Sequence, residues 1–140
     1  MKQIISTLIV VVLVVIAAFV LYPVLKTSQK RFDVNIQKFN DDAGNIIQGL
    51  QQYKEFVGSY PAGTNNVDIV KALQGKTDKK VLILAVQKSE LSQKGEMVDP
   101  WGTPVMFYFS GNAVLIRSAG PNKAWEDSSI IGSDDLFRTN

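Results

Sequence analysis

The chain has 140 residues, enough for one modest domain, and its 15 basic and 13 acidic residues give a net charge of +2. This balance gives no argument for nucleic-acid binding, so we expect no nucleic-acid partner. The absence of Cys excludes a disulfide framework, and the absence of His removes the commonest general base and the commonest metal ligand.

Residues 4–25 contain no charged side chain and are almost entirely apolar. As a helix, these roughly 22 residues would span about 33 Å, which is enough to cross a bilayer. A cleavable signal peptide has a shorter apolar core followed by a small-x-small site, and Ala17–Phe19 is a poor site of that kind. We therefore predict that residues 1–25 form a retained transmembrane anchor helix.

The charges beside the anchor do not by themselves agree with an exported domain. Lys2 precedes the apolar run, whereas Lys26, Lys30 and Arg31 follow it. The positive-inside rule would favour a cytoplasmic C-terminal side. The orientation is therefore open on charge alone.

Apolar residues after the anchor alternate in spacing between four and three positions, which is typical of one helical face. They are Phe32, Ile36, Phe39, Ala43, Ile46, Leu50, Tyr53 and Val57. We predict a single helix from the membrane to about Val57, ended by Gly58, within a globular domain 26–140 that includes the amphipathic half 26–57. Fewer than four heptads favour a face that packs on this domain over a coiled-coil seam.

The segment that follows contains one short helix and one ambiguous apolar run. Asn66 can cap a helix that Gly75 stops. Residues 81–86, VLILAV, fit either a strand or a buried helix, because periodicity does not separate the two in so short a run.

The C-terminal half reads as β structure. DPWG at Asp99–Gly102 fits a type I turn with Asp99 as its cap, and we expect Trp101 in the core. Residues 104–109 and 113–118 are rich in aromatic and β-branched residues and flank Ser-Gly-Asn, which predicts a β-hairpin.

Several short motifs occur in a recognisable order: YPAG at 60–63, LQG at 73–75, DPWGTP at 99–104, RSAGPN at 117–122 and SDDL at 133–136. This order resembles the major pseudopilin of type II secretion, a relative of the type IV pilins. The resemblance covers about 58–136, and 99–104 and 118–122 are its most specific parts. It implies an α+β, pilin-like fold, in which a long N-terminal helix, first transmembrane and then amphipathic, packs on a small three-stranded antiparallel sheet.

The function that the resemblance implies is structural and not enzymatic. The chain would be a subunit of a secretion or type IV pilus-like filament, anchored by a single pass in the bacterial inner membrane with an extracytoplasmic domain. It would self-assemble through its N-terminal helix and contact the platform proteins of secretion or pilus assembly.

The N-terminus departs from the family pattern. Pilin-like precursors have a basic leader ending in Gly and a Glu at the fifth mature position, but here the first Gly is Gly44 and the first acid is Asp33. Either a leader lies upstream of this sequence, or the chain is a non-processed relative. The second case corresponds to the alternative function: a single-span, membrane-anchored extracytoplasmic binding protein of an envelope or secretion complex.

The stretch 118–136 combines turn-forming residues with four carboxylates. In the resembling family this loop binds calcium, which implies a Ca²⁺ site here formed by Asn122, Asp127, Asp134 and Asp135, with nearby carbonyl groups completing the six to eight oxygens that Ca²⁺ takes. A solvated acidic loop is the alternative. A catalytic carboxylate pair is disfavoured, since no feature of the sequence indicates the shaped, partly buried site that such chemistry needs.

Overall fold

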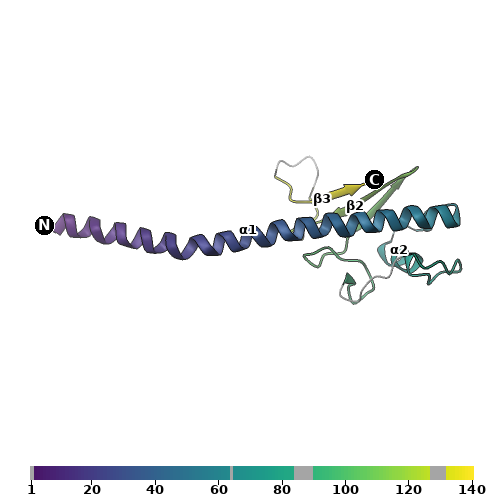
Figure 1. Ribbon diagram of the computed structural model, residues 1–140, viewed down its shortest axis with the longest axis horizontal. Coiled ribbons are helices and arrows are strands. Elements are labelled where there is room, and N and C mark those ends of the chain that lie inside the picture. Colours follow the sequence, from purple (N-terminus) through teal and green to yellow (C-terminus); the bar gives the residue numbers. More distant parts are fainter. Residues whose placement is uncertain (1, 64, 84–89, 127–131) are drawn as a thin grey trace. The chain divides into compact units, whose positions relative to one another are not determined.

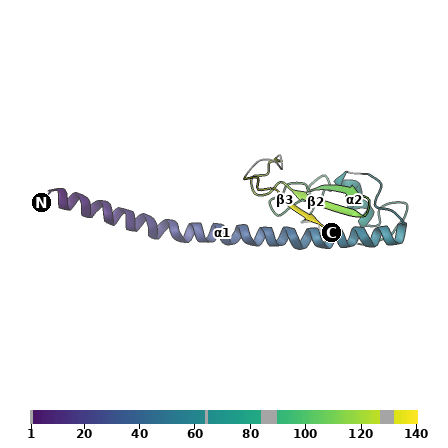
Figure 2. The same cartoon turned by 90° about the horizontal axis from the view of Figure 1, so that it is seen from above.

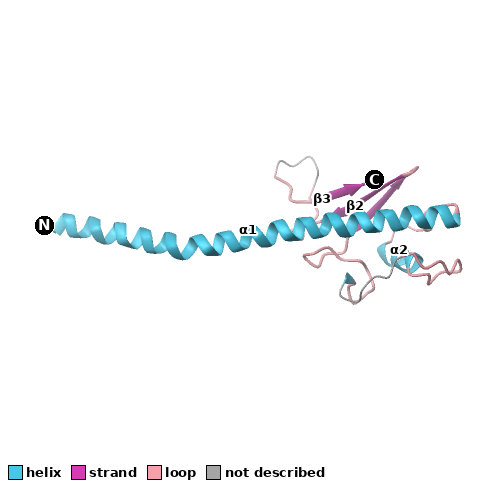
Figure 3. Cartoon of the chain, in the orientation of Figure 1, coloured by secondary structure: helices cyan, strands magenta, loops and turns pink. Residues whose placement is uncertain are grey.

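The computed structural model describes residues 2–63, 65–83, 90–126 and 132–140, with side chains from Val12 onward. In these residues the elements are α1 (Lys2–Val57), α2 (Asn66–Leu73), β1 (Met106–Ser110), β2 (Ala113–Ser118) and β3 (Leu136–Thr139) (Figures 1 and 3). The predicted α+β class, a long N-terminal helix with a small antiparallel sheet, is confirmed. The chain divides into two compact units, Met1–Val34 and Asn35–Asn140.

The first unit is helical, and it is apolar from residue 4 up to Leu25. Every side chain described from Val12 to Leu25 is exposed, and Phe19 is 83% exposed. By length and composition alone, α1 is able to cross a membrane. Pro23 lies inside the helix and lacks the N–H that would continue the backbone ladder, while its carbonyl accepts a hydrogen bond of 2.8 Å from the Thr27 hydroxyl.

The second unit contains the hydrophobic core, and the C-terminal part of α1 supplies one side of it. The predicted stripe is confirmed at Phe39, Ala43, Ile46, Leu50 and Tyr53, all of which are buried. Ile36 and Val57 are partly buried, whereas Phe32 is exposed. Ile47, which the stripe did not include, is also buried.

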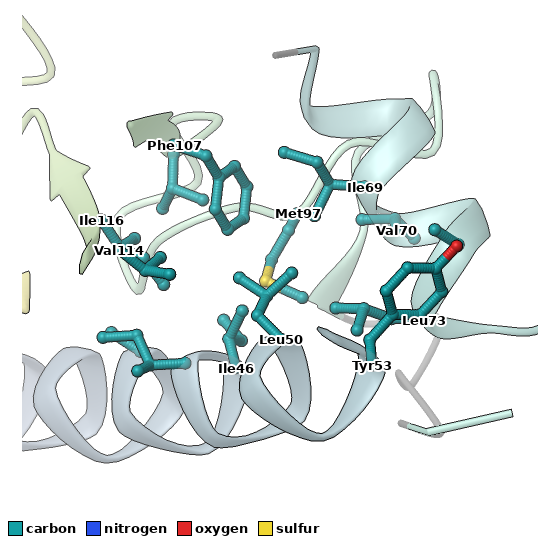
Figure 4. Close-up of a cluster of buried hydrophobic side chains, with 14 of the residues drawn as sticks. Ile46, Leu50, Tyr53, Ile69, Val70, Leu73, Met97, Phe107, Val114 and Ile116 are labelled. Carbon is teal, nitrogen blue, oxygen red and sulfur yellow. The ribbon is translucent and has the colours of Figure 1, made fainter. Parts of the chain in front are cut away.

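Figure 4 shows how this face meets the rest of the core. Ile46, Leu50 and Tyr53 point from α1 toward side chains of the sheet and of α2, with Met97 between them. The partners are Ile69, Val70 and Leu73 from α2, and Phe107, Val114 and Ile116 from β1 and β2. Such burial of apolar surface contributes about 25 cal/mol per Å² to folding.

α2 begins one residue earlier than the sequence analysis predicted. Its N-cap is Asn65, whose side-chain oxygen accepts the backbone N–H of Asp68. Asn66 was therefore wrongly assigned as the cap: it is the first helical residue. The predicted stop at Gly75 is confirmed, because Lys76 N–H bonds the Lys71 carbonyl and Gly75, at φ +68°, bonds Ala72 in the manner of a Schellman motif.

The sheet is antiparallel, in the order β1-β2-β3, and Figure 2 shows it beside the C-terminal part of α1. The predicted hairpin is confirmed: Ser110 pairs with Ala113 across a two-residue loop of Gly111 and Asn112. Gly111 has φ +58°, as the first loop residue of a type II′ turn requires. β3 then pairs with β2, from Ser118↔Leu136 to Leu115↔Thr139.

Much of the chain between α2 and β1 is irregular, as the loops of Figure 3 show. Leu82 forms an isolated bridge with Gln74, while residues 84–86 of the ambiguous apolar run lie outside the described residues. The predicted turn at DPWG is present, with Gly102 N–H bonded to the Asp99 carbonyl at 2.9 Å. Trp101 was wrongly placed in the core, because it is only half-buried and does not belong to the core cluster.

Candidate metal centre

The C-terminal loop starts from a buried polar contact. Ser118 ends β2, and its hydroxyl donates to Asp99 Oδ2 at 2.6 Å while accepting the backbone N–H of Gly120 at 3.0 Å. Asp99 is itself held by the DPWG turn, since its Oδ1 accepts the backbone N–H groups of Trp101 and Thr103. The turn before β1 and the start of the loop after β2 are thereby tied together.

Gly120 allows two loop segments to approach each other closely. Its φ is +66°, in the left-handed region that favours glycine, and a Cβ at this position would overlap the backbone carbonyl of Asp134. Glycine is thus required here both by the backbone angle and by space.

Three carboxylates converge next to this contact. Glu126, Asp134 and Asp135 each offer an oxygen, and these oxygens lie within 4.8 Å of one another. Two oxygens that bind one Ca²⁺ at 2.3–2.6 Å lie at most about 5 Å apart. The spacing is therefore compatible with joint ligation of a calcium-sized cation.

Two of the three carboxylates have an oxygen without a partner. Asp134 Oδ1 and Asp135 Oδ1 are buried, and neither accepts a hydrogen bond in the part of the chain that the structure describes. A buried, unsatisfied acceptor costs about 1–3 kcal/mol, and more when it is charged. A cation bound between these oxygens would remove this penalty.

The remaining oxygens are used to hold the cluster together. The Asp134 N–H donates to Glu126 Oε2 at 2.9 Å, and the Asn122 amide group donates to Glu126 Oε1 at 3.0 Å. Asn122 N–H in turn donates to Asp134 Oδ2 at 3.2 Å. Glu126 and Asp134 are consequently oriented by the same short loop.

Arg117 sets the charge balance of the cluster. From β2 it forms a partly buried ion pair with Asp135, with Nε 2.6 Å from Asp135 Oδ2, and also donates to the backbone carbonyl of Glu126. The rings of Trp125 and Phe137 each lie 5.3 Å from its guanidinium carbon. Three carboxylates against one guanidinium leave two negative charges, which one divalent cation would neutralise.

The pKa of Glu126 lies below its ordinary value. The hydrogen bond from the Asp134 backbone lowers it most, followed by that from the Ser133 hydroxyl, and these outweigh desolvation. The Asn122 amide and the charge of Arg117 lower it further. Glu126 is therefore ionised at neutral pH, as a metal ligand must be.

The structure places the four expected ligands differently. Asp134 and Asp135 lie in the cluster. Asn122 lies beside it: its side-chain oxygen accepts the N–H of Ala124 at 2.7 Å, and its amide group donates to Glu126. Asp127 lies outside the described residues.

Sequence reasoning did not select Glu126 and Arg117. Glu126 stands in the same acidic stretch as Asp127, and only the loop conformation distinguishes neighbouring acids. Arg117 belongs to a strand and meets Asp135 from 18 positions away, so no local pattern marks this pair.

Comparisons of the chain with protein-family models, with curated proteins and with solved structures find no match. Its function is therefore inferred from the sequence pattern and from the geometry described above.

Proposed function

We propose that the chain is a pilin-like structural subunit, a pseudopilin of type II secretion or a subunit of a type IV pilus-like filament, anchored in the bacterial inner membrane. The apolar part of α1 would lie in the bilayer and unit Asn35–Asn140 on the extracytoplasmic side. Copies would assemble through their N-terminal helices on the platform proteins of a secretion or pilus system. This role needs packing and no reaction, so we propose no enzymatic activity.

One observation carries the proposal: α1 has an apolar surface that the described part of the chain leaves uncovered. All side chains described from Val12 to Leu25 are exposed, including Val15 at 56% and Leu25 at 67%. Soluble monomers rarely expose so large an apolar surface, and in a bilayer a helix satisfies all of its own backbone groups. Lipid, or the α1 helices of other copies, would cover it.

A second support is the agreement between the motif order and the fold. The long helix, short helix, DPWG turn, hairpin and closing strand follow one another as the pseudopilin resemblance implies. Ser118 belongs to the RSAGPN motif and Asp99 to DPWG, and their side chains meet in the interior. Two motifs that were noted separately thus belong to one structural unit.

For the cluster of Glu126, Asp134 and Asp135 we propose a Ca²⁺ ion as the ligand. Carboxylate oxygens are the ligands of a hard cation, and the flexible geometry of Ca²⁺ suits an irregular loop better than the strict octahedron of Mg²⁺ does. The ion would neutralise the cluster and hold the loop after β2 against β3.

The alternative is a static membrane anchor that presents a binding domain to an envelope or secretion complex. It is favoured by the absence of any acidic residue before Asp33, because filament subunits of the resembling family pair a Glu near the helix start with a neighbour's amine. Intact mass and N-terminal sequencing of the protein from membranes would separate the two. A cleaved, N-methylated terminus supports the filament route, and an intact Met1 supports the static anchor.

Orientation is tested by a reporter fused after Asn140 that is active only outside the cytoplasm. Both readings place the domain outside, against the positive charges of Lys26, Lys30 and Arg31. We expect an active reporter. Activity of a matched reporter that works only in the cytoplasm would overturn both readings.

A further inference from the structure

β1 forms an edge of the sheet and lacks the charged residue or Pro that commonly blocks pairing. β1 is an outer strand in the order β1-β2-β3, and its sequence, MFYFS, contains no charged residue and no Pro. Natural edge strands are commonly blocked by Lys, Pro or a bulge, because an open edge pairs with other strands. An uncharged aromatic edge is therefore a candidate binding surface.

The backbone groups that point outward from this edge are hydrogen-bonded at Val105 and, among the described residues, have no partner further along β1. Val105 N–H donates to the Met97 carbonyl at 3.0 Å, and the Val105 carbonyl accepts the Asn66 amide group at 2.7 Å, both away from β2. Alternate residues of a strand direct their backbone groups to the same side. Phe107 and Phe109 continue this outward row, and in the described part of the chain their outward groups have no partner.

An open groove of about 720 Å³ runs along this edge. Its lining includes the exposed side chains of Met106, Tyr108 and Trp125, which give it an apolar wall. Among the described residues that line it, Glu96 alone is charged; it is half-buried and accepts a hydrogen bond from the Ser92 hydroxyl at 3.1 Å. The groove thus combines free backbone groups, an apolar wall and one negative charge.

We propose that this groove binds an extended segment of a partner polypeptide, which adds to the sheet as a strand beside β1. Strand addition satisfies the outward groups of Phe107 and Phe109, and alternate side chains of the segment take pockets on the wall. Charge complementarity to Glu96 calls for a Lys or Arg at one end of the segment. This inference does not depend on the proposed filament role.

A second copy of the chain is the competing occupant, and its two free edges fit less well. β3 has only four residues, and β1 contains no basic residue that could meet Glu96. The one basic side chain of β3, Arg138, is exposed and lies beside Gly44 of α1. The groove therefore matches a basic, extended segment better than it matches either free edge of a second copy.

The test uses the full chain in detergent micelles and a capped, fluorescent peptide of sequence KVTVTV. In one control peptide the odd-numbered residues carry N-methyl groups, and in a second the even-numbered residues carry them. A third control peptide has Glu in place of Lys. Strand pairing uses the N–H groups of either the odd-numbered or the even-numbered residues, not both. We expect the parent peptide and one of the two methylated peptides to bind. The other methylated peptide and the Glu peptide should bind at least about tenfold more weakly, equivalent to about 1.4 kcal/mol.

Matched protein variants test the edge itself. Tyr108 and Thr139 flank Leu115 on the same face at opposite edges of the sheet. Tyr108→Lys should weaken peptide binding about tenfold, because it places a blocking positive charge on the edge, whereas Thr139→Lys should not change it. Hydrogen exchange at the amides of Phe107 and Phe109 should slow when the peptide binds.

Three results would overturn the proposal. They are no binding of the parent peptide, equal binding of both methylated peptides, and equal effects of the two Lys variants. A different result would assign the edge to a second copy instead. In that case, concentrated protein without peptide would show slow hydrogen exchange at Phe107 and Phe109, together with the mass of a dimer.

Discussion

Ser118 and Asp99 lie 19 positions apart and are joined by a buried hydrogen bond of 2.6 Å between Ser118 Oγ and Asp99 Oδ2. The bond links the turn before β1 to the loop after β2, and that loop carries the acidic cluster. The conformation of the loop that forms the candidate metal centre therefore depends on a contact made inside the domain.

Substitution of this pair should be destabilising. Asp99→Ala leaves three donors unsatisfied, from Trp101, Thr103 and Ser118, and should lower the free energy of unfolding by about 2–4 kcal/mol. Ser118→Ala should cost about 1–2 kcal/mol, and the two effects should not add. Denaturant unfolding of the single and double variants measures both, with the exposed Ser110→Ala as control. Full additivity would contradict a direct energetic link.

Asn66 has a role that its sequence position did not reveal. Its side chain accepts the N–H of Met97 and donates to the carbonyls of Met97 and Val105, which ties α2 to the edge of the sheet. We expect Asn66→Ala to cost about 2–3 kcal/mol of unfolding free energy. Asn65→Ala removes the helix cap and an exposed hydrogen bond to the Asp68 carboxylate, and should cost about 1 kcal/mol. A larger loss for Asn65→Ala than for Asn66→Ala in thermal unfolding would contradict this assignment.

Gly120 should not tolerate a side chain. Gly120→Ala combines a left-handed backbone angle with overlap on the Asp134 carbonyl, and we expect a loss of about 2–4 kcal/mol together with a displaced loop. The control is Gly111→Ala, which has a similar angle, φ +58°, but open space around the new Cβ, and it should cost about 1 kcal/mol. Similar melting temperatures for the two variants would show that the contact with Asp134 carries no energy.

Calcium should stabilise the folded chain. An ion that binds only the folded form contributes about 2.7 kcal/mol at a hundredfold excess over Kd. We expect Ca²⁺ to raise the melting temperature of chelator-treated protein and Mg²⁺ to raise it less, because Mg²⁺ demands tighter octahedral geometry. Asp134→Ala should abolish the response, and Asp78→Ala, at an exposed site in a separate turn, should leave it intact. An unchanged melting curve in millimolar Ca²⁺ would leave the loop as a solvated acidic surface.

The parts of the fold that could be predicted are those that local physics determines. The apolar stripe of α1 repeats over many turns, so most of its buried face could be read, although Ile47 was missed and Phe32 is exposed. The hairpin was readable because Gly111 lies between two runs of strand-forming residues. Helix ends are less certain by nature: Asn65 and Asn66 are equally good caps, and tertiary bonds to Met97 decide between them.

The remaining parts depend on contacts between distant residues. β3 has four residues, and only its pairing with β2 distinguishes it from loop. The selection of Glu126 for the acidic cluster depends on the approach of Gly120 to Asp134, and Arg117 joins the cluster through a partner far along the chain. Trp101 follows the same rule, since its apolar side chain favoured the core but the turn leaves it half-buried and outside the core cluster.

The central claim, assembly through α1, is tested most directly by disulfide cross-linking in membranes. The chain has no Cys, so every thiol is an introduced one. One Cys replaces Val12 and a second is moved along residues 13–25, while Val12→Cys alone serves as the control. Repeated head-to-tail contacts form open arrays, whereas a two-fold contact closes at the dimer. We expect at least one spacing to give a ladder of dimers, trimers and larger species on oxidation, and the single-Cys control to stop at the dimer. Monomers and dimers alone at every spacing would contradict filament assembly.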